Sequence, residues 1–280
     1  MSMFAFKQVD VFSSVPLKGN PLAVVIAADA LDEARMAAFA HWTNLSETIF
    51  LLRPTRPEAD YRVRIFTPAG ELPFAGHPTL GACAVWLACG GRPRGDTVIQ
   101  ECAAGLITLR REGSQVAFAA PPLSRSGPVE SELLPRIAAG LGLSTGEICE
   151  AQWVDNGPGW LAVRLASRRR VLDLRPDAVL MGGLKVGVVA PWDPAVDGAD
   201  AQFEVRAFVS EQGLLEDPVT GSLNAGIAQW LIGSGRAPQS YVVAQGTALG
   251  RAGRVHVRQT GTDIWVGGEV VTCIEGTVAL

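Results

Sequence analysis

Two segments of the chain are long enough to form a helix and are apolar on almost every side. They are PTLGACAVWLA at 78–88 and GSLNAGIAQWLI at 221–232. A helix that is apolar all round must be buried all round, and each segment is shorter than the roughly 18 residues that a membrane span requires. In a chain rich in strands, a sheet can bury a whole helix by wrapping around it as a barrel. The sequence therefore predicts two barrels, each with a helix as its core.

The first half of the chain is dominated by expected strands. Alternating or β-branched apolar runs bounded by turn residues occur at 4–12, 22–27, 48–53, 61–67, 97–102, 106–110 and 116–119. One amphipathic helix is expected at about 31–42, capped by Asp29. A second is expected in the run after Ser126, with Gly140 and Gly142 at its end.

A weak internal repeat relates the two halves. YRVRIF at 61–66 matches FEVRAF at 203–208, and NPLAVV at 20–25 resembles GWLAVR at 159–164. Each half then reaches an apolar segment that holds a Trp-Leu pair, Trp86-Leu87 or Trp230-Leu231. A duplicated architecture follows. We expect an α+β protein of two pseudo-symmetric halves, each a barrel-like, mostly antiparallel sheet around a buried central helix.

We expect the domains to be 1–118 and 119–269, with a strand at about 270–280 returning to the first domain. The net charge of -4 and the pI near 5.5 give no electrostatic footprint for nucleic acid or an anionic membrane. The one dense basic run, Arg168 to Arg170, follows Ser167 and is expected to be a solvated loop. The beginning of the chain lacks a signal-peptide pattern, which favours a cytoplasmic protein.

The five cysteines argue against a metal or disulfide role. They form an odd set with no C-x-x-C spacing, so neither a zinc site nor a disulfide framework is expected. No metal and no cofactor are expected. We expect activity to survive chelators and mild alkylation.

The entrances to the two apolar helices are the candidate functional positions. A helix N-terminus carries unpaired N–H groups and about half a positive charge. The first entrance reads Gly76-His77-Pro78, and the second reads Thr220-Gly221-Ser222 just after Asp217. Two such ends facing one cleft between the domains would bind a small anionic carboxylate. Ordinary helix capping by Thr220 and Ser222 is the alternative that the residues leave open.

Four blocks in order along the chain resemble the signature blocks of the phenazine biosynthesis PhzF-like family. They are GNPLAVV at 19–25, NLSETIFLL at 44–52, IFTPAGELPFAGHPTLGAC at 65–83 and EDPVTGSLNAGIAQWL at 216–231. With WVGGEVV near the C-terminal end, the resemblance spans nearly the whole chain. It implies a fold related to diaminopimelate epimerase and proline racemase, with the active site between the two halves.

The resemblance also implies roles for individual residues. Relatives in the epimerase branch use a cysteine at each helix entrance, whereas this chain has none there, and Cys83 further along the helix is expected to be inert. PhzF-like enzymes instead use the glutamate of the SETIF block, here Glu47, as a proton shuttle. His77 and Asp217 match the family's other catalytic residues.

The remaining candidate site residues are expected to bind substrate, and Ser222 among them matches the family's carboxylate binder. They are Gly76, Gly221, Ser222, Thr220 and Asn20. Each candidate has a structural alternative: Glu47 as an ordinary carboxylate at a strand start, His77 as a helix cap, and Asp217 as a turn residue before Pro218. The other histidines, His41 and His256, lie in a helix pattern and a strand pattern and are expected to be structural.

The resulting expectation is a cofactor-independent isomerase that moves a proton between carbons of a small carboxylic acid. A hydrolase or lyase using Glu47 and His77 is one alternative, although no G-x-S-x-G elbow is present. A non-catalytic carboxylate-binding protein is the other. We also expect a homodimer, because family members are often dimers and because Trp153, Trp160 and Trp192 exceed what small barrels readily bury.

Overall fold

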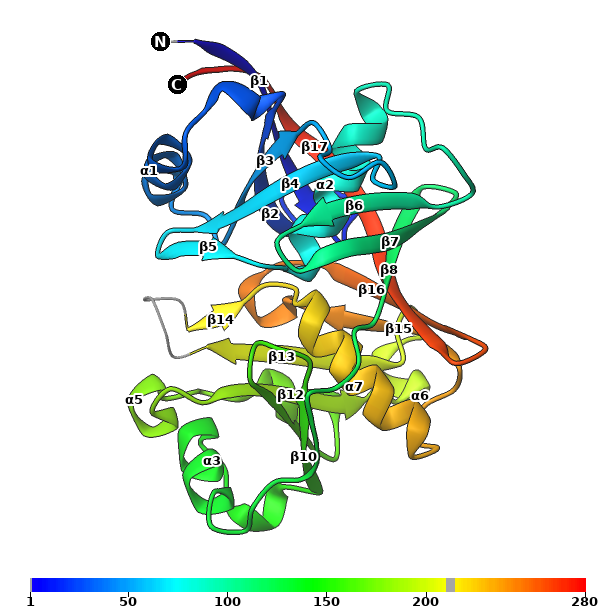
Figure 1. The fold of residues 1–280 in the computed structure, drawn as a ribbon. Helices are drawn as coiled ribbons and strands as arrows, with labels where there is room; N and C mark the ends of the chain where they lie inside the picture. Colours follow the sequence, from blue (N-terminus) through cyan, green and yellow to red (C-terminus); the bar gives the residue numbers. More distant parts are fainter. Residues whose placement is uncertain (1, 210–214) are drawn as a thin grey trace. The chain divides into compact units, whose positions relative to one another are not determined.

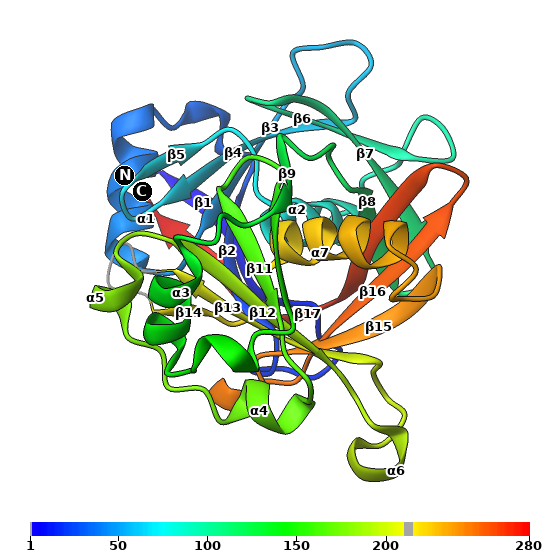
Figure 2. The ribbon, with the colours of Figure 1, turned by 90° about the horizontal axis from the view of Figure 1, so that it is seen from below.

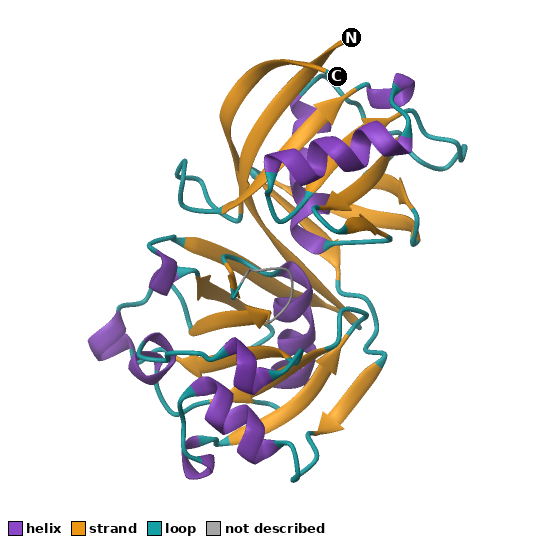
Figure 3. Cartoon of the chain, turned by 90° about the vertical axis from the view of Figure 1, so that its left-hand side faces the viewer, coloured by secondary structure: helices purple, strands orange, loops and turns teal. Residues whose placement is uncertain are grey.

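Strands hold more residues than helices in both halves of the chain (Figure 3). The computed structural model describes residues 2–209 and 215–280. The strands are β1 Met3–Val11, β2 Asn20–Ile26, β3 Thr48–Leu52, β4 Tyr61–Thr67, β5 Gly70–Leu72, β6 Val98–Cys102, β7 Gly105–Glu112, β8 Gln115–Ala119, β9 Arg125–Pro128, β10 Glu150–Asp155, β11 Trp160–Arg164, β12 Lys185–Pro191, β13 Phe203–Val209, β14 Glu216–Asp217, β15 Ser240–Gln245, β16 Gly253–Thr260 and β17 Asp263–Ala279. The helices are α1 Glu33–Thr43, α2 Gly76–Ala88, α3 Leu134–Leu141, α4 Arg168–Leu172, α5 Ala178–Met181, α6 Pro194–Asp197 and α7 Gly221–Gly233, with short 3₁₀ turns at Ala28–Ala30, Thr145–Glu147 and Thr247–Leu249.

The chain divides into two units, and strand β17 contributes to both. Unit 1 consists of Met1–Ala119 and Gly267–Leu280, and unit 2 consists of Ala120–Val266. The boundary at 266/267 lies inside β17. Unit 1 is therefore built from two separate stretches of sequence.

Unit 1 contains a closed barrel of eight strands around helix α2 (Figure 1). The strands pair in the order β1, β2, β3, β4, β6, β7, β8 and β17, and β17 pairs with β1 to close the ring. Two neighbouring pairs, β2–β3 and β4–β6, are parallel. Helix α2 contacts β1, β2, β3, β4, β6 and β8. The sequence prediction of a helix enclosed by a mostly antiparallel sheet is confirmed here.

Helix α1 covers the outer face of the same barrel. Val25 and Phe50, in neighbouring strands, pack with Phe39 of α1. Successive side chains of a strand point to opposite faces, so a strand with α2 inside and α1 outside has both faces buried. All five residues of β3 are accordingly buried, which explains the continuous apolar run TIFLL.

The expected first residue and cap of α1 were wrong by a few positions. The helix begins at Glu33, and the Asp32 side chain accepts a hydrogen bond from the Arg35 N–H at 2.8 Å. Asp29 instead accepts a hydrogen bond from the Arg53 N–H at 3.0 Å. Both aspartates lie near the expected start of the helix, and the Arg53 N–H at the end of β3 engages Asp29 outside the helix.

Unit 2 repeats the strand pattern of unit 1. Its sheet runs β9, β10, β11, β12, β13, β15 and β16, with parallel pairing at β11–β12 and β13–β15. Helices α3, α4 and α5 pack on one face of this sheet through Ile137, Val171 and Met181. Helix α7 contacts β10, β11 and β16 (Figure 2).

The two units show the same order of parallel and antiparallel pairs. From β1 to β7 the directions are antiparallel, parallel, antiparallel, parallel and antiparallel, and from β10 to β16 they are the same. The matched segments YRVRIF and FEVRAF lie in the equivalent strands β4 and β13. The predicted internal repeat is therefore a structural repeat.

The central helices α2 and α7 are each thirteen residues long and carry a glycine at the same position. A Cβ on Gly81 would lie 2.4 Å from Leu22, and one on Gly226 would lie 2.1 Å from the Val154 carbonyl oxygen. Both glycines let the helix approach a barrel strand closely. The Trp-Leu pairs are offset by one residue, because Trp86 is residue eleven of α2 and Trp230 is residue ten of α7.

Two further expectations for unit 2 need correction. The helix expected after Ser126 begins only at Leu134, because 125–128 forms strand β9 and pairs with β10. Gly142 ends this helix with φ of 69°, whereas Gly140 lies inside it, where a Cβ would meet Met181. Gly140 is therefore required by its packing against Met181 and not by the helix end.

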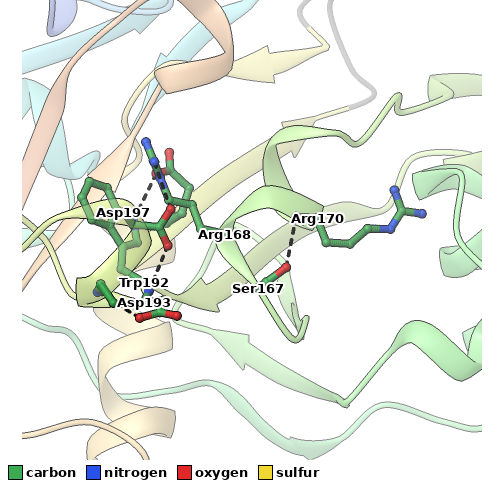
Figure 4. Close-up of polar contacts among 8 residues, drawn as sticks. Ser167, Arg168, Arg170, Trp192, Asp193 and Asp197 are labelled. Carbon is green, nitrogen blue, oxygen red and sulfur yellow. Dashed lines mark hydrogen bonds and ion pairs between the residues drawn. The ribbon is translucent and has the colours of Figure 1, made fainter.

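The arginine-rich run is a short helix and not a solvated loop. Ser167 is the N-cap of α4, and the Arg168 guanidinium donates to Glu204 Oε2 at 3.0 Å (Figure 4). The same guanidinium lies 4.2 Å from the centre of the Trp192 ring. Buried Glu204 thus supplies the counter-charge that holds Arg168 against the sheet.

Unit 2 itself buries two of the three tryptophans that entered the argument for a dimer. Trp153 is 8% exposed and Trp160 is 3% exposed. The Trp153 ring belongs to the core between the sheet and α3, and its Nε1 donates to Glu130 at 2.9 Å. The premise that the barrels cannot bury these rings is wrong for both: Trp153 is covered by the outer-face helices, and Trp160 Nε1 donates to Ser222 of α7.

Among residues 2–209 and 215–280, no helix combines the length and the apolar character needed to span a membrane. Within the same residues, no group of three or more His, Cys, Asp or Glu side chains is arranged to hold a metal ion.

Candidate active site

Strand pairing and helix α2 bring three of the expected residues of unit 1 together. Asn20 is the first residue of β2, and Glu47 directly precedes β3, its parallel neighbour. His77 is in the first turn of α2, which contacts both strands. The parallel pairing places the starts of β2 and β3 at the same end of the barrel. The three side chains meet there, at the entrance of α2.

His77 lies between the other two side chains. Its Nε2 is 3.4 Å from Glu47 Oε2, and its Nδ1 is 3.4 Å from Asn20 Nδ2. The histidine is 4% exposed, Asn20 is fully buried, and the Glu47 side chain is 15% exposed. Glu47 is thus the member of the group that solvent can reach.

The protonation state of His77 follows from its surroundings. Burial lowers the pKa of His77 to about 3, whereas an ion pair with Glu47 would raise it. We favour the lowered pKa, because the Asn20 amide N–H₂ donates to Nδ1 and therefore requires a lone pair on that nitrogen. The neutral imidazole then carries its hydrogen on Nε2, which faces the Glu47 carboxylate.

The entrance of α2 has no side chain to satisfy its N–H groups. The N-cap residue is Ala75, which cannot form a cap hydrogen bond. The helix begins with the buried Gly76, and His77 uses its ring for the contacts with Asn20 and Glu47 rather than for a cap. The N-terminus of α2, which carries a partial positive charge, therefore lies near the Glu47 carboxylate.

In unit 2, Asp217 and Thr220 form a second group of polar residues, around Gln245. The Thr220 hydroxyl donates to Asp217 Oδ2 at 2.5 Å. Gln245, which is fully buried, donates from Nε2 to Thr220 Oγ1 at 3.0 Å and to the Asp217 carbonyl at 3.2 Å. Its Oε1 accepts from the Thr220 N–H at 3.1 Å and from Asn224 at 2.7 Å. One glutamine thus fixes the approach to helix α7.

Ser222 is oriented by Trp160, the first residue of β11, and by Asn156 in the turn between β10 and β11. Trp160 Nε1 donates to the Ser222 hydroxyl oxygen at 3.0 Å, and the Asn156 amide donates to the Ser222 carbonyl at 2.9 Å. A hydroxyl oxygen that accepts one hydrogen bond can still donate its own hydrogen, so Ser222 is able to donate to a ligand. Neither Thr220 nor Ser222 makes a side-chain cap hydrogen bond to α7. The helix-capping alternative is therefore not what the structure has.

The two entrances share one construction. In each unit an N–H donor at the start of a strand contacts the side chain of the second residue of the central helix: Asn20 contacts His77, and Trp160 contacts Ser222. These strands, β2 and β11, are the ones that hold NPLAVV and GWLAVR. The sequence repeat aligns Asn20 with Gly159 and therefore did not indicate Trp160, and Asn156 and Gln245 carry no signal in the sequence either.

The two other histidines lie in the elements that the sequence predicted for them, and Cys83 is buried. His41 lies in α1 and contacts the Pro68 carbonyl at 3.2 Å, and His256 lies in strand β16. Cys83 is fully buried inside unit 1, and burial raises the pKa of its thiol to about 12. A thiol of that pKa is protonated at neutral pH, so Cys83 is not a nucleophile.

Comparison with known proteins agrees with this architecture. The family model of Phenazine biosynthesis-like proteins (PhzC-PhzF) matches residues 9–276. Antisense-enhancing sequence 1 of Schizosaccharomyces pombe is 36% identical, with 99% of each chain covered. The trans-2,3-dihydro-3-hydroxyanthranilate isomerase of Pseudomonas aeruginosa is 34% identical, with 98% of this chain and 95% of that protein covered.

Solved structures extend the similarity to the fold. A PhzF family protein of Enterococcus faecalis superimposes with a TM-score of 0.82 at 25% identity, with 100% of both chains covered. A hydroxyproline epimerase of Agrobacterium vitis, at 17% identity and a TM-score of 0.59 over 99% of this chain and 93% of that one, shares the fold.

The relatives that match this chain over nearly its whole length are named isomerases, and the chain is an enzyme of the isomerase class. More particularly, the chain belongs to the phenazine biosynthesis-like PhzC-PhzF family.

Proposed function

We propose that Glu47 is the acid/base of the isomerisation. Its carboxylate removes a proton from one carbon of the substrate and returns it to another, so no redox partner or second substrate is consumed. The observation that carries the proposal is the 3.4 Å contact between Glu47 Oε2 and His77 Nε2. The carboxylate lies beside a buried histidine and is the member of the group that solvent can reach, which suits a group that exchanges a proton with a substrate.

The other residues hold the substrate and the developing charge. Ser222 and the N–H groups of Gly76 and Gly221 would bind a carboxylate, because the two helix entrances have no side-chain caps. Asp217, held by Thr220, would exchange a proton or a hydrogen bond with the substrate.

The substrate class that we propose is a small unsaturated or amino-bearing carboxylic acid. The relative from Pseudomonas aeruginosa is named for trans-2,3-dihydro-3-hydroxyanthranilate, an acid of this type. That compound is the first substrate to test.

The experiment compares wild type with Glu47→Gln in deuterated solvent. Glu47→Gln keeps the shape of the side chain and removes the titrating group, so turnover should fall by roughly 10² to 10⁴ while affinity changes little. Deuterium should enter the wild-type product at carbon. Glu58→Gln, at an exposed position of unit 1, is the matched control and should behave as wild type.

The same measurement separates the alternatives. A product whose mass differs from the substrate by more than exchanged hydrogen would identify a hydrolase or lyase. Binding without exchange would identify a carboxylate-binding protein. Exchange at the wild-type rate in Glu47→Gln would exclude Glu47 as the shuttle.

A further inference from the structure

A short two-stranded arm precedes each central helix, and the two arms are equivalent. In unit 1 the arm is β4 with β5, and in unit 2 it is β13 with β14. Phe66 pairs with Glu71 in the first arm, and Phe208 pairs with Glu216 in the second. Each arm therefore places a glutamate opposite a phenylalanine, just before the chain turns into the helix.

The same arginine contact holds both glutamates. Arg64 donates from Nε and Nη2 to the two oxygens of Glu71 at 2.7 and 2.5 Å. Arg206 donates from Nε and Nη2 to the two oxygens of Glu216 at 2.9 and 2.7 Å. Two parallel N–H···O bonds fix the carboxylate in orientation as well as in distance. We call each pair a clasp.

The segment that follows each clasp has the same length and the same proline and glycine. It reads ELPFAG at 71–76 and EDPVTG at 216–221. The clasp glutamate is thus five residues before the first residue of the central helix in both units. The residue after the glutamate is Leu72 in unit 1 and Asp217 in unit 2. Only in unit 2 is the residue that follows the clasp glutamate in the sequence ionisable.

The clasp of unit 2 is also the more strongly held. The side chains of Arg206 and Glu216 are each 6% exposed, against 25% and 29% for Arg64 and Glu71. Arg206 Nη1 donates further to the carbonyls of Val171 and Leu174 at 3.1 and 3.0 Å. The extra partners of Arg206 are thus backbone groups at the end of α4, which are fixed in place.

The extra partner of Arg64 is different in kind. It is Glu33, whose side chain is 73% exposed. Exposed ion pairs contribute little to stability. Loss of the clasp of unit 1 is therefore expected to disturb its arm less than loss of the clasp of unit 2.

We infer that Arg206 is a positioning residue for the isomerase reaction. Through Glu216 it fixes the backbone that carries Asp217, while Gln245 holds the Asp217 carbonyl and Thr220 holds its carboxylate. This inference rests on the proposed role of Asp217. A displacement of about 1 Å in a catalytic group can slow a reaction by about 10²-fold, so the rigidity of the clasp bears directly on turnover.

The test compares Arg206→Lys with Arg64→Lys. Lysine keeps the charge but cannot form the two parallel bonds. We expect Arg206→Lys to lower kcat by roughly 10- to 100-fold with KM changed less than threefold. Arg64→Lys, the matched control, should change kcat by less than about threefold. Equal effects of the two substitutions would overturn the inference.

A double variant shows whether Arg206 acts through Asp217. If it does, Arg206→Lys should slow an Asp217→Asn enzyme by less than about twofold, because the displaced group no longer reacts. Effects that multiply would show that Arg206 does not act through Asp217 and would overturn the inference. If Arg206→Lys does not fold, Glu216→Asp replaces it. This substitution keeps both charges and shortens the carboxylate side chain of the clasp, and the same results are expected to support or to overturn the inference.

The two proposals fail in different ways. Full activity of Asp217→Asn would remove Asp217 from the mechanism and with it the ground for a clasp effect on kcat. Slow turnover of Asp217→Asn together with normal turnover of Arg206→Lys would overturn the clasp inference alone.

Discussion

The burial of a neutral histidine makes the stability of the protein depend on pH in a defined direction. The pKa of His77 is lowered by burial from 6.5 to about 3. Above pH 6.5 neither the folded nor the unfolded chain binds a proton at this position. Between pH 6.5 and about 3 the unfolded chain binds one and the folded chain does not, so stability is lost as the pH falls.

The size of the loss follows from the two pKa values. At pH 4 the unfolded chain gains about 3 kcal/mol from protonating His77, because each tenfold change in proton concentration is worth about 1.4 kcal/mol. Other groups also titrate in this range. The measurable quantity is therefore the difference in pH dependence between wild type and His77→Gln, which has no proton to bind.

The assay is urea unfolding of both proteins at several values of pH from 7 to 4. The free energy of unfolding of wild type should fall by about 3 kcal/mol more than that of His77→Gln over this range. His41→Gln, at an exposed histidine of α1, should follow wild type. If stability instead increased toward low pH relative to His77→Gln, His77 would be a charged partner of Glu47, and the reasoning from burial would be refuted.

Three other variants or treatments test the site and the packing. Ser222→Ala removes a hydroxyl held by Trp160 and should weaken binding of a small carboxylate about tenfold, measured by calorimetry; unchanged affinity would exclude Ser222 as a ligand. Gly226→Ala should lower the free energy of unfolding by roughly 1 to 3 kcal/mol in a urea titration, because its Cβ would lie 2.1 Å from a carbonyl oxygen. Gly233→Ala, whose Cβ would meet nothing within 4 Å, should leave the free energy of unfolding nearly unchanged, and equal effects of the two substitutions would contradict the packing argument. Activity should survive a chelator and an alkylating reagent, with buried Cys83 unlabelled in the mass spectrum and exposed Cys89 labelled; loss of activity restored by zinc would contradict a metal-free mechanism.

The sequence predicted the fold well where a pattern has one physical solution. An apolar helix too short for a membrane has to be enclosed, and α2 lies inside a barrel as expected. The match between YRVRIF and FEVRAF predicted equivalent strands, and β4 and β13 are equivalent. Helix ends were predicted less well, since Asp29 and Asp32 both fit a cap and only a tertiary contact with Arg53 separates them.

The candidate site was predicted as residue types and not as a network. Glu47, His77 and Asn20 were named, and they meet, because parallel strands begin at one end of the barrel. Gln245 was missed, because its contacts with Thr220 span 25 residues and leave no periodic signal.

The homodimer stays a prediction. Its argument from composition failed for Trp153 and Trp160, since a count of aromatic residues does not reveal that the fold of unit 2 buries both rings.

The discontinuity of unit 1 has a consequence for synthesis on the ribosome. Strand β1 pairs with both β2 and β17, and the segment of β17 that belongs to unit 1 comes after the whole of unit 2. During translation, residues 120–266 therefore emerge while β1 still exposes one unpaired edge. Unpaired edges are prone to wrong associations. The nascent chain must hold this open barrel until residues 267–280 leave the exit tunnel, so unit 2 can complete its folding first although its sequence comes second.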